Sequence, residues 1–482
     1  MEKTKIDPGL LLCSAAALSI FATGCNSGRS NEDNEQRPNV VFVFADQWRA
    51  QATGFAGDPN AITPTIDKLA SESMVFSAAV CNAPVSSPYR ASLLTGRYPL
   101  SHGIFMNDVS LNPEINSMGK IYREAGYKTA YIGKWHLDGH GRSAWIPPER
   151  RQGFDYWKVL ECTHNYNNSL YYDNDDTIPS KWQGYDAYYQ TLDAANFIRE
   201  HAKGEKPFLM LLSWGPPHNP YNTAPEEYQK KYENFDIQLR PNVPEQLREK
   251  AITDLKGYYA HINALDDCIG ILLKTIEDNG IEDNTIFVFT SDHGDMLYSQ
   301  GMERKQKPFD ESILVPFILR YPAIHEARNI TIGAPIGTPD ILPTLLGLSG
   351  VKIPESIEGD DLSVYISGRK KLSDNNILIL SVTPFGEWNR SRGGIEYRGI
   401  RNRQYTYVRN PEGPWLLFDN IKDPFQKVNL VNDNKYAGLK RKLEKALQKK
   451  LKELKDEFLP GQNYIDKWGY KVDETGTVQY RQ

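Results

Sequence analysis

Residues 39–47 decide the fold, and they read Asn39-Val40-Val41-Phe42-Val43-Phe44-Ala45-Asp46-Gln47. The run is almost entirely β-branched and aromatic, which predicts a strand of a parallel sheet that is buried on both faces. A second run of this kind, residues 284–291, leads directly into Asp292 and His293. Open α/β sheets bind ligands at the carboxyl ends of their strands, so the two runs would bring Asp46 and Asp292 to one divalent cation. Taken singly, either acid is more often a cap for the turn that follows it.

Three further apolar stretches extend the predicted sheet, at residues 131–137, 208–214 and 314–319. Beyond Asn375 the pattern changes to short strands separated by turn residues, at 377–381, 394–398, 404–409 and 415–418, which is typical of an antiparallel meander. A helix follows, with apolar residues at three- and four-residue steps from Leu439 to Phe458 and a lysine-rich, solvated outer face. The sequence therefore predicts an α/β fold. A large mixed, mostly parallel sheet flanked by helices would occupy residues 37–374, and a C-terminal antiparallel sheet with a helix would form a smaller α+β subdomain in residues 375–482.

The composition is that of an ordinary globular protein, with 482 residues, 40% hydrophobic and 24% charged, and a formal net charge of −5. This charge provides no basic surface for nucleic acid, so we expect no nucleic-acid partner. An anionic substrate would need a local cluster of cations instead. Outside the first 25 residues the cysteines are Cys81, Cys162 and Cys268, and this odd, widely spaced set predicts buried free thiols.

The first 25 residues are typical of an export signal. Lys3 and Lys5 precede an apolar run that is too short for a stable membrane anchor. The last four of these residues, Ala22-Thr23-Gly24-Cys25, resemble a bacterial lipobox, which implies a signal peptide over residues 1–24 and a lipid anchor on Cys25. We therefore expect an exported bacterial lipoprotein, in the periplasm or at the cell surface. The alternative is a plain secretory signal with an incidental cysteine. Residues 25–36 are polar and predict a disordered tether.

The segment 85–97 has the pattern of a functional site and reads Val85-Ser86-Ser87-Pro88-Tyr89-Arg90-Ala91-Ser92-Leu93-Leu94-Thr95-Gly96-Arg97. Pro88 predicts a turn, and a short helix would follow through residues 91–94 and end at Gly96. Two serine hydroxyls and Arg90 would then lie at a helix N-terminus, where backbone N–H groups favour anions. A nucleophile for an anionic substrate fits this position, and so does an ordinary capping serine.

This segment resembles the signature of the type I sulfatases. The residues that match are Ser86-x-Pro88-x-Arg90 and the Leu-Leu-Thr-Gly-Arg that follows. In that family the first Cys or Ser is oxidised to formylglycine, so the resemblance implies a serine-type enzyme in which a sulfatase-maturating enzyme converts Ser86. Tyr89 stands where family members usually carry a small residue. The resemblance extends from Arg37 to about Leu454 and implies an alkaline phosphatase-like fold, with the catalytic sulfatase domain in residues 37–374.

Three further segments match the same family. In Gly-Lys-Trp-His, the resemblance implies that Lys134 holds sulfate and His136 contacts the formylglycine, and an extended backbone would point both side chains to one side. In Pro-Pro-His-Asn-Pro, the flanking prolines would fix His218 in a rigid loop. Lys305 stands at the family spacing of a second sulfate-binding lysine, and Lys307 is the competing position.

The resemblance also implies a metal site. Its ligands would be Asp46, Gln47, Asp292 and His293, together with the modified Ser86 side chain. Gln47 and His293 take positions where many sulfatases have Asp and Asn. Carboxylate and amide oxygens suit Ca²⁺ or Mg²⁺, whereas an imidazole shifts the preference toward Mn²⁺ or Zn²⁺. We expect Ca²⁺, with Mg²⁺ and Mn²⁺ as the alternatives.

The implied reaction is hydrolysis of sulfate esters through a formylglycine hydrate. One hydroxyl would attack sulfur, and the other, once deprotonated, would expel sulfate and restore the aldehyde. Arg90 and the metal would lower the pKa of the hydroxyl, and Lys134 and Lys305 would bind the sulfate oxygens. His218 is the hypothetical general acid and His136 the hypothetical base.

Two other functions stay open. Asp46-Gln47 with Asp292-His293 resembles the phosphodiester and phosphonate monoester hydrolases of the same superfamily as much as the sulfatases. Alternatively, Ser86 stays a serine in a catalytically silent glycan-binding lipoprotein. Family analogy favours a sulfated sugar as substrate. Residues 156–189 are dense in Tyr, Trp, Asn and Asp, and they would either line a carbohydrate pocket or form a structural flap.

Overall fold

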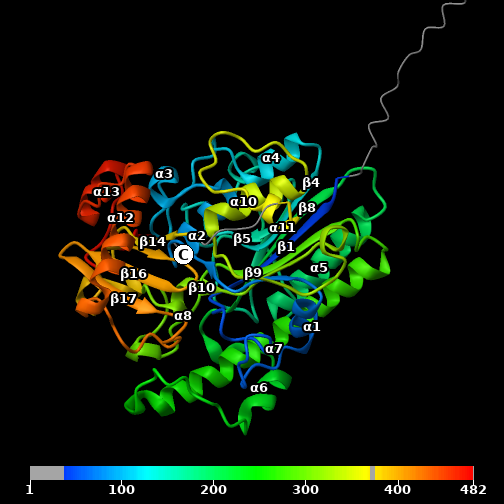
Figure 1. The fold of residues 1–482 in the computed structure, drawn as a ribbon. Helices are drawn as coiled ribbons and strands as arrows, with labels where there is room; N and C mark the ends of the chain where they lie inside the picture. The colour runs from blue at the N-terminus through cyan, green and yellow to red at the C-terminus, as the bar shows by residue number, and fades with distance from the viewer. Residues whose placement is uncertain (1–36, 370–374, 481–482) are drawn as a thin grey trace, which may run out of the picture. The chain divides into compact units, whose positions relative to one another are not determined.

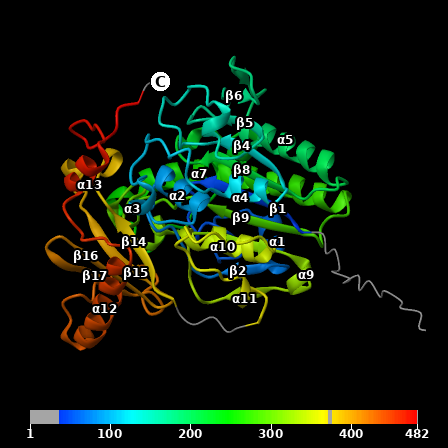
Figure 2. The same cartoon turned by 90° about the horizontal axis from the view of Figure 1, so that it is seen from above.

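A ten-stranded sheet forms the centre of the protein, in a computed structural model that describes residues 37–369 and 375–480. Figure 2 shows the strands of this sheet side by side, with the C-terminal strands to one side of them. In spatial order the sheet contains β12 (Ile330–Ile332), β2 (Met74–Phe76), β11 (Phe317–Arg320), β9 (Thr285–Ser291), β1 (Asn39–Asp46), β8 (Phe208–Pro217), β4 (Lys128–Lys134), β5 (Tyr156–Leu160), β6 (Leu170–Asp173) and β7 (Ser180–Lys181). The predicted signal peptide 1–24, the tether 25–36 and Cys25 lie outside the described residues.

Strand β1 is parallel to both of its neighbours, β8 and β9, as the apolar run predicted. All eight of its residues are buried. Val40, Phe42 and Phe44 belong to one hydrophobic core, whereas the alternating residues Val41 and Val43 belong to another. Because successive side chains of a strand point to opposite faces, this alternation means that β1 is covered on both sides.

Helices cover both faces of the sheet, and Figure 1 shows the three layers. One core packs β1 against α1 (Pro64–Ser71), α5 (Asp186–His201) and α7 (Arg248–Asp278), with α6 (Glu226–Glu233) beside α7. The other core packs β1 against α2 (Ser86–Thr95), α4 (Met118–Glu124) and α10 (Thr338–Leu348). The predicted mostly parallel sheet with flanking helices is therefore confirmed, and the antiparallel strand β11 makes it mixed.

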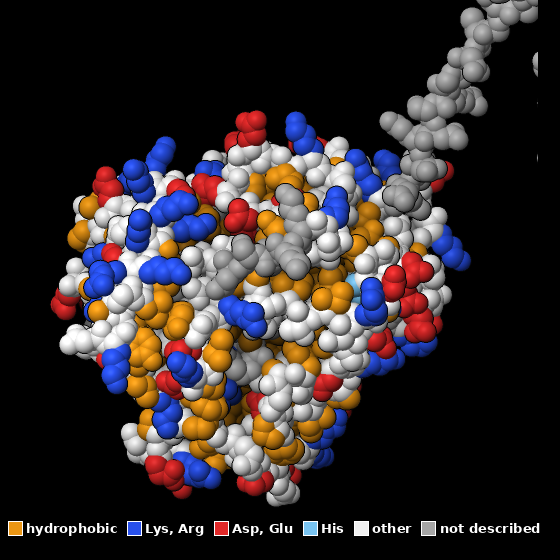
Figure 3. All heavy atoms as spheres, viewed as in Figure 1, with side chains coloured by type: hydrophobic (Ala, Val, Ile, Leu, Met, Phe, Trp, Pro, Cys, Tyr) orange, Lys and Arg blue, Asp and Glu red, His pale blue; other side chains and the backbone are white. Residues whose placement is uncertain are grey.

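The C-terminal region contains the predicted antiparallel meander, β14 (Ile377–Ser381), β15 (Tyr397–Arg401), β16 (Tyr405–Asn410) and β17 (Gly413–Asp419). One face of this sheet packs on a three-stranded sheet of β10 (Leu314–Val315), β3 (Ala79–Val80) and β13 (Ile336–Gly337) and on α8 (Asp310–Ile313). Its other face packs on α12 (Ala437–Glu453), and α13 (Gly461–Trp468) follows. Figure 3 shows Lys and Arg side chains gathered over this C-terminal region, as expected for a lysine-rich solvated helix face.

Two predicted element bounds in the C-terminal region were wrong. Strand β15 begins at Tyr397 and not at Gly394, because Gly393 is left-handed and the Gly394 amide closes a turn on the Asn389 carbonyl at 2.9 Å. Helix α12 ends at Glu453, since Lys455 and Phe458 both have positive φ. The first five residues of the segment 156–189 form β5, a parallel neighbour of β4 in the main sheet.

The described part of residues 37–482 forms one compact unit, and the predicted domain boundary at 374 falls next to the segment 370–374, which lies outside the described residues. Cys81, Cys162 and Cys268 are buried and free, as predicted. Among the described helices, none combines the length and the apolar character needed to span a bilayer.

Candidate active site

Two adjacent strands end in the acids that the sequence singled out. Ala45 of β1 pairs with Ser291 of β9, so the next residue of each strand, Asp46 and Asp292, emerges at the same edge of the sheet. The Asp292 amide donates to the Ala45 carbonyl at 3.0 Å, and the Gln47 amide donates to the Asp292 carboxylate at 3.0 Å. The parallel register therefore brings the two carboxylates together.

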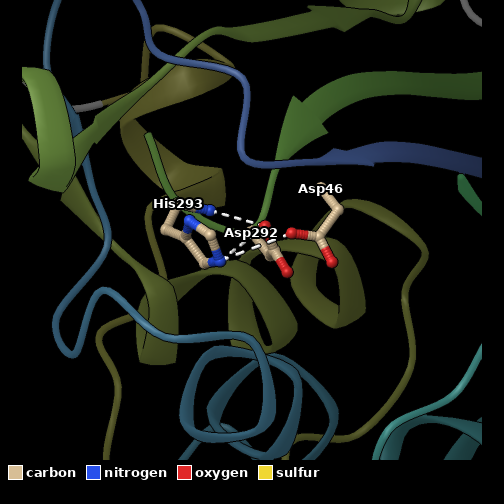
Figure 4. A group of neighbouring side chains, drawn as sticks. All are labelled: Asp46, Asp292 and His293. Atoms are coloured by element: carbon tan, nitrogen blue, oxygen red, sulfur yellow. Dashed lines mark hydrogen bonds and ion pairs between the residues drawn. The ribbon is translucent and has the colours of Figure 1, made fainter. Parts of the chain in front are cut away.

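Asp46, Asp292 and His293 form a buried cluster in which one ligand atom from each lies within 4.8 Å of the others (Figure 4). The Nε2 atom of His293 lies 3.4 Å from Asp46 Oδ1 and 3.5 Å from Asp292 Oδ1. The Nδ1 atom lies 3.0 Å from the Gly294 carbonyl, and a proton on Nδ1 leaves Nε2 free to bind a metal. Asp46 Oδ1 is buried and accepts no hydrogen bond from the described residues. Two carboxylates and one imidazole are suitable ligands for a divalent cation, and Asp46 Oδ1 is available to bind it.

Ser86 is the first residue of α2 and lies next to this cluster. Its Oγ is 3.2 Å from His293 Nε2 and 3.4 Å from Asp46 Oδ2. The sequence predicted a turn at Pro88 with the helix after it, but the helix already begins at Ser86. Pro88 is tolerated in the first turn because the N–H that it lacks would have no partner within the helix. Gly96 ends the helix in the left-handed conformation, as predicted.

Arg90 ties the elements of the site together. Its Nη1 donates to the Lys134 carbonyl and to Ser213 Oγ, both at 2.7 Å. Its Nη2 lies 3.2 Å from Asp292 Oδ2 and 3.4 Å from Asp46 Oδ2. The guanidinium is buried and contacts both carboxylates. Arg90 therefore links the cluster of Asp46, Asp292 and His293 to strands β4 and β8.

Lys134 forms an ion pair with Asp46, with Nζ 2.5 Å from Oδ2. Burial would raise the pKa of Asp46, but the positive charge of Lys134 holds this pKa well below its ordinary value. Although burial would lower the pKa of Lys134, the charge of Asp46 in turn raises it, so the pair is ionised. Lys134 is the last residue of β4, where the main sheet delivers it to the same edge as Asp46 and Asp292.

His136 does not continue the extended strand. The strand β4 ends at Lys134, and His136 has a φ of 60°, so an extended backbone cannot be the reason for its direction. Its Nε2 lies 3.5 Å from Asp108 Oδ1, and its carbonyl accepts a 2.7 Å hydrogen bond from Ser87 Oγ. Burial lowers the pKa of His136 to about 3, although the Asp108 hydrogen bond opposes this effect. His136 is therefore a neutral imidazole in this arrangement.

Lys305 and His218 form a second group beside Gln47. Lys305 Nζ lies 2.7 Å from His218 Nε2 and 3.1 Å from Gln47 Oε1. His218 Nδ1 is 2.8 Å from the Asn219 carbonyl, so Nδ1 donates there and Nε2 accepts from Lys305. Lys307, the competing lysine, instead donates from Nζ to the Glu303 carbonyl at 2.6 Å.

Several residues around this group were missed by the sequence reasoning. Gln47 Nε2 donates to Asp295 Oδ2 at 2.7 Å, and Asp295 also accepts from the Tyr221 hydroxyl, which in turn contacts Arg304. His164 stacks on His218. Asp295 could have been suspected from its place in Asp-His-Gly-Asp, and Tyr221 from its place directly after Pro-Pro-His-Asn-Pro, whereas His164 lies in a loop without a motif.

Comparisons with known proteins agree with this geometry. Residues 38–351 match the family described as Sulfatase, and residues 300–454 match the family described as N-sulphoglucosamine sulphohydrolase, C-terminal. The chain is 46% identical over 444 residues to an ulvan-active sulfatase of Formosa agariphila, covering 91% of this chain and 86% of that protein. It is 29% identical over 513 residues to an endo-4-O-sulfatase of Bacteroides thetaiotaomicron, covering 91% and 97%. The crystal structure of a putative sulfatase of Bacteroides fragilis superposes with a TM-score of 0.80 at 29% identity, covering 89% and 98%.

These likenesses and the cluster at the strand ends define an alkaline phosphatase-like hydrolase. The match over residues 38–351 then fixes the family, because it covers well over half of the chain. The chain belongs to the sulfatase family and is a sulfuric ester hydrolase.

Proposed function

We propose that the protein hydrolyses sulfate esters of carbohydrates and that its nucleophile is a formylglycine made from Ser86 by a sulfatase-maturating enzyme. The observation that carries the nucleophile is the position of Ser86 Oγ, 3.2 Å from His293 Nε2 and beside Asp46 at the start of α2. The sugar is supported by the names of relatives, an ulvan-active sulfatase and an endo-4-O-sulfatase.

A formylglycine hydrate would supply one hydroxyl to attack sulfur and a second one to expel sulfate afterwards. Asp46, Asp292 and His293 would hold a divalent cation that lowers the pKa of the hydroxyl at position 86, and Gln47 is a further candidate ligand. We propose Ca²⁺ for this ion, with Mg²⁺ and Mn²⁺ as alternatives, since two of the three clustered side chains offer oxygen.

The remaining roles belong to the cations and histidines of the chain. Lys134 and Lys305 would bind the sulfate oxygens, and Arg90 would hold the Asp46 and Asp292 side chains in place. The proton for the departing alkoxide would be held between Lys305 Nζ and His218 Nε2, because these atoms lie 2.7 Å apart. His136 is the proposed base that accepts the proton when sulfate is expelled, and Asp108, with Oδ1 3.5 Å from His136 Nε2, would stabilise the protonated ring.

Mass spectrometry of the peptide that contains Ser86 tests this proposal. After expression with a maturating enzyme, we expect the loss of two hydrogen atoms at Ser86 and a hydrazine adduct of the aldehyde. The Ser86→Ala variant provides the control and should release no sulfate from 4-nitrophenyl sulfate. An active enzyme with an unmodified serine would refute the nucleophile. Faster turnover of an aryl phosphonate than of the aryl sulfate would favour the phosphonate monoester hydrolases, and glycan binding without turnover would favour a silent binding protein.

We also propose that the protein is an exported bacterial lipoprotein, held at a membrane by a lipid on Cys25. The support is the sequence Ala22-Thr23-Gly24-Cys25 after an apolar segment. We expect the wild-type protein in the membrane fraction of the producing cells and the Cys25→Ser variant in the soluble fraction. Equal amounts of both proteins in the soluble fraction would refute the lipid anchor.

A further inference from the structure

His164 lies among the charged groups of the active site, although no motif pointed to it. It belongs to the loop between β5 and β6, and its imidazole stacks on that of His218, with ring centroids 4.4 Å apart and 10° between the planes. Burial and then the positive charge of Lys134 lower the pKa of His164 well below its ordinary value, and Lys305 acts in the same direction. The ring is therefore a neutral group among cations.

The loop that carries His164 is held firmly against the loop of His218. Tyr166 is fully buried, and its hydroxyl donates to the His218 carbonyl at 2.9 Å. Its ring fills the space beside Gly215, where a Cβ atom would come within 2.6 Å of Tyr166 Cε1. On the other side of His164, the Cys162 amide donates to the Arg142 carbonyl at 3.1 Å. His164 therefore has a fixed position and is not a residue of a freely moving loop.

The two stacked imidazoles differ in their hydrogen bonds. Both nitrogens of His218 are used, by the Asn219 carbonyl and by Lys305. His164 Nε2 is buried and has no hydrogen-bond partner among the described residues. A buried polar atom without a partner costs free energy, and a ligand that supplies the partner recovers it. Of the two stacked imidazoles, His164 is therefore the one that keeps a ring nitrogen for a hydrogen bond to a substrate.

We propose that His164 is a specificity residue that binds a hydroxyl group of the sugar that carries the sulfate, an inference that rests on the proposed function. Lys134 and Lys305 are cations and suit the anionic sulfate, whereas a neutral imidazole donates to or accepts from a hydroxyl. A site built to hydrogen-bond a hydroxyl discriminates strongly against a substrate that lacks it, because the polar atom of the site then stays unpaired. Both roles considered for residues 156–189 are then present in one loop. Tyr166 has a structural role and fixes the loop, whereas His164 lines the sugar pocket.

The test compares two substrates in the His164→Ala variant of the matured enzyme. One is the best substrate of the wild-type enzyme in a panel of sulfated mono- and disaccharides, and the other is 4-nitrophenyl sulfate, which has no hydroxyl group next to the ester. We expect the ratio of kcat/KM for the sugar to kcat/KM for the aryl sulfate to fall by about 10- to 100-fold. His164→Gln keeps a donor and an acceptor and should recover part of the ratio. Asn168→Ala is the matched control, because Asn168 is an exposed residue of the same loop, and it should leave the ratio unchanged.

An equal loss on both substrates would overturn the proposal, because His164 would then act through the position of His218. An unchanged ratio in His164→Ala would overturn it as well. Failure of the proposed function is a different result, in which the wild-type enzyme releases sulfate from neither ester.

Discussion

Replacing Lys305 by methionine tests the central electrostatic claim about the site. Lys305 Nζ lies 2.7 Å from His218 Nε2 and 3.1 Å from Gln47 Oε1, and its side chain is only 5% exposed. Two unit charges about 4 Å apart interact by about 4 kcal/mol at an effective dielectric constant of about 20. Loss of one preorganised donor to a developing oxyanion costs about 3 to 4 kcal/mol, so we expect kcat/KM to fall by about 150- to 900-fold.

Lys307→Met is the matched control for this experiment. Lys307 is 4% exposed, lies two residues away and donates to the Glu303 carbonyl. We expect Lys307→Met to change kcat/KM by less than about threefold.

The assay is the initial rate of sulfate release from 4-nitrophenyl sulfate by matured enzyme, with the melting temperature of each variant as a check on folding. A Lys305→Met enzyme within about threefold of wild type would show that the ammonium does not stabilise the transition state. Equal losses in the two variants would show that the segment matters only for structure.

Three further predictions concern the metal, the backbone and pH. Added Ca²⁺ should raise the melting temperature of the wild-type protein, because Ca²⁺ at 100 times its Kd stabilises the folded state by about 2.7 kcal/mol. Asp292→Asn should abolish this rise. An equal rise in both proteins would contradict the metal site. Gly133→Ala should destabilise the protein to urea by about 2 to 4 kcal/mol, because Gly133 has a φ of 103° and a Cβ atom would lie 2.1 Å from the Ser213 carbonyl oxygen. Burial raises the pKa of Asp186 to about 8, so the folded state keeps a proton that the unfolded state loses near pH 4, and this contribution to stability falls as pH rises from about 4 to 8. Asp186→Asn should therefore stabilise the protein by about 1 to 3 kcal/mol at pH 8 and less at pH 5, as measured by thermal unfolding.

The sheet could be predicted from the sequence because its central strands carry a local signal. Residues 40–45 and 286–289 are apolar without interruption, and the structure makes the strands that contain them parallel neighbours. The carboxyl ends of parallel strands meet at one edge, so the pattern allowed Asp46 and Asp292 to meet, and the resemblance to the sulfatases favoured this arrangement. The strand predicted at 394–398 was displaced because its register depends on the turn at Gly393, which the pattern of apolar residues does not reveal.

The surroundings of the site were less predictable, because loops position them. Lys305 and Lys307 lie on the same short segment and are equally buried, and only the folded chain places Lys305 against His218. We expected His136 and Lys134 to point to the same side because we assumed an extended backbone. His136 has a positive φ, so its backbone is not extended and the direction of its side chain could not be predicted in this way. Whether a loop turns at one residue or the next depends on its packing partners and not on its own composition.

The sequence by itself therefore determined the class of fold, the edge of the sheet that carries the site and the chemical types of the groups found there. Strand periodicity and strand direction are local properties, and they fix these features before any loop is placed. Only the tertiary structure decided which lysine faces His218, how Tyr166 locks its loop and why His164 keeps a nitrogen without a partner. These features arise from contacts between segments far apart in the chain, and no repeating pattern of residues encodes them.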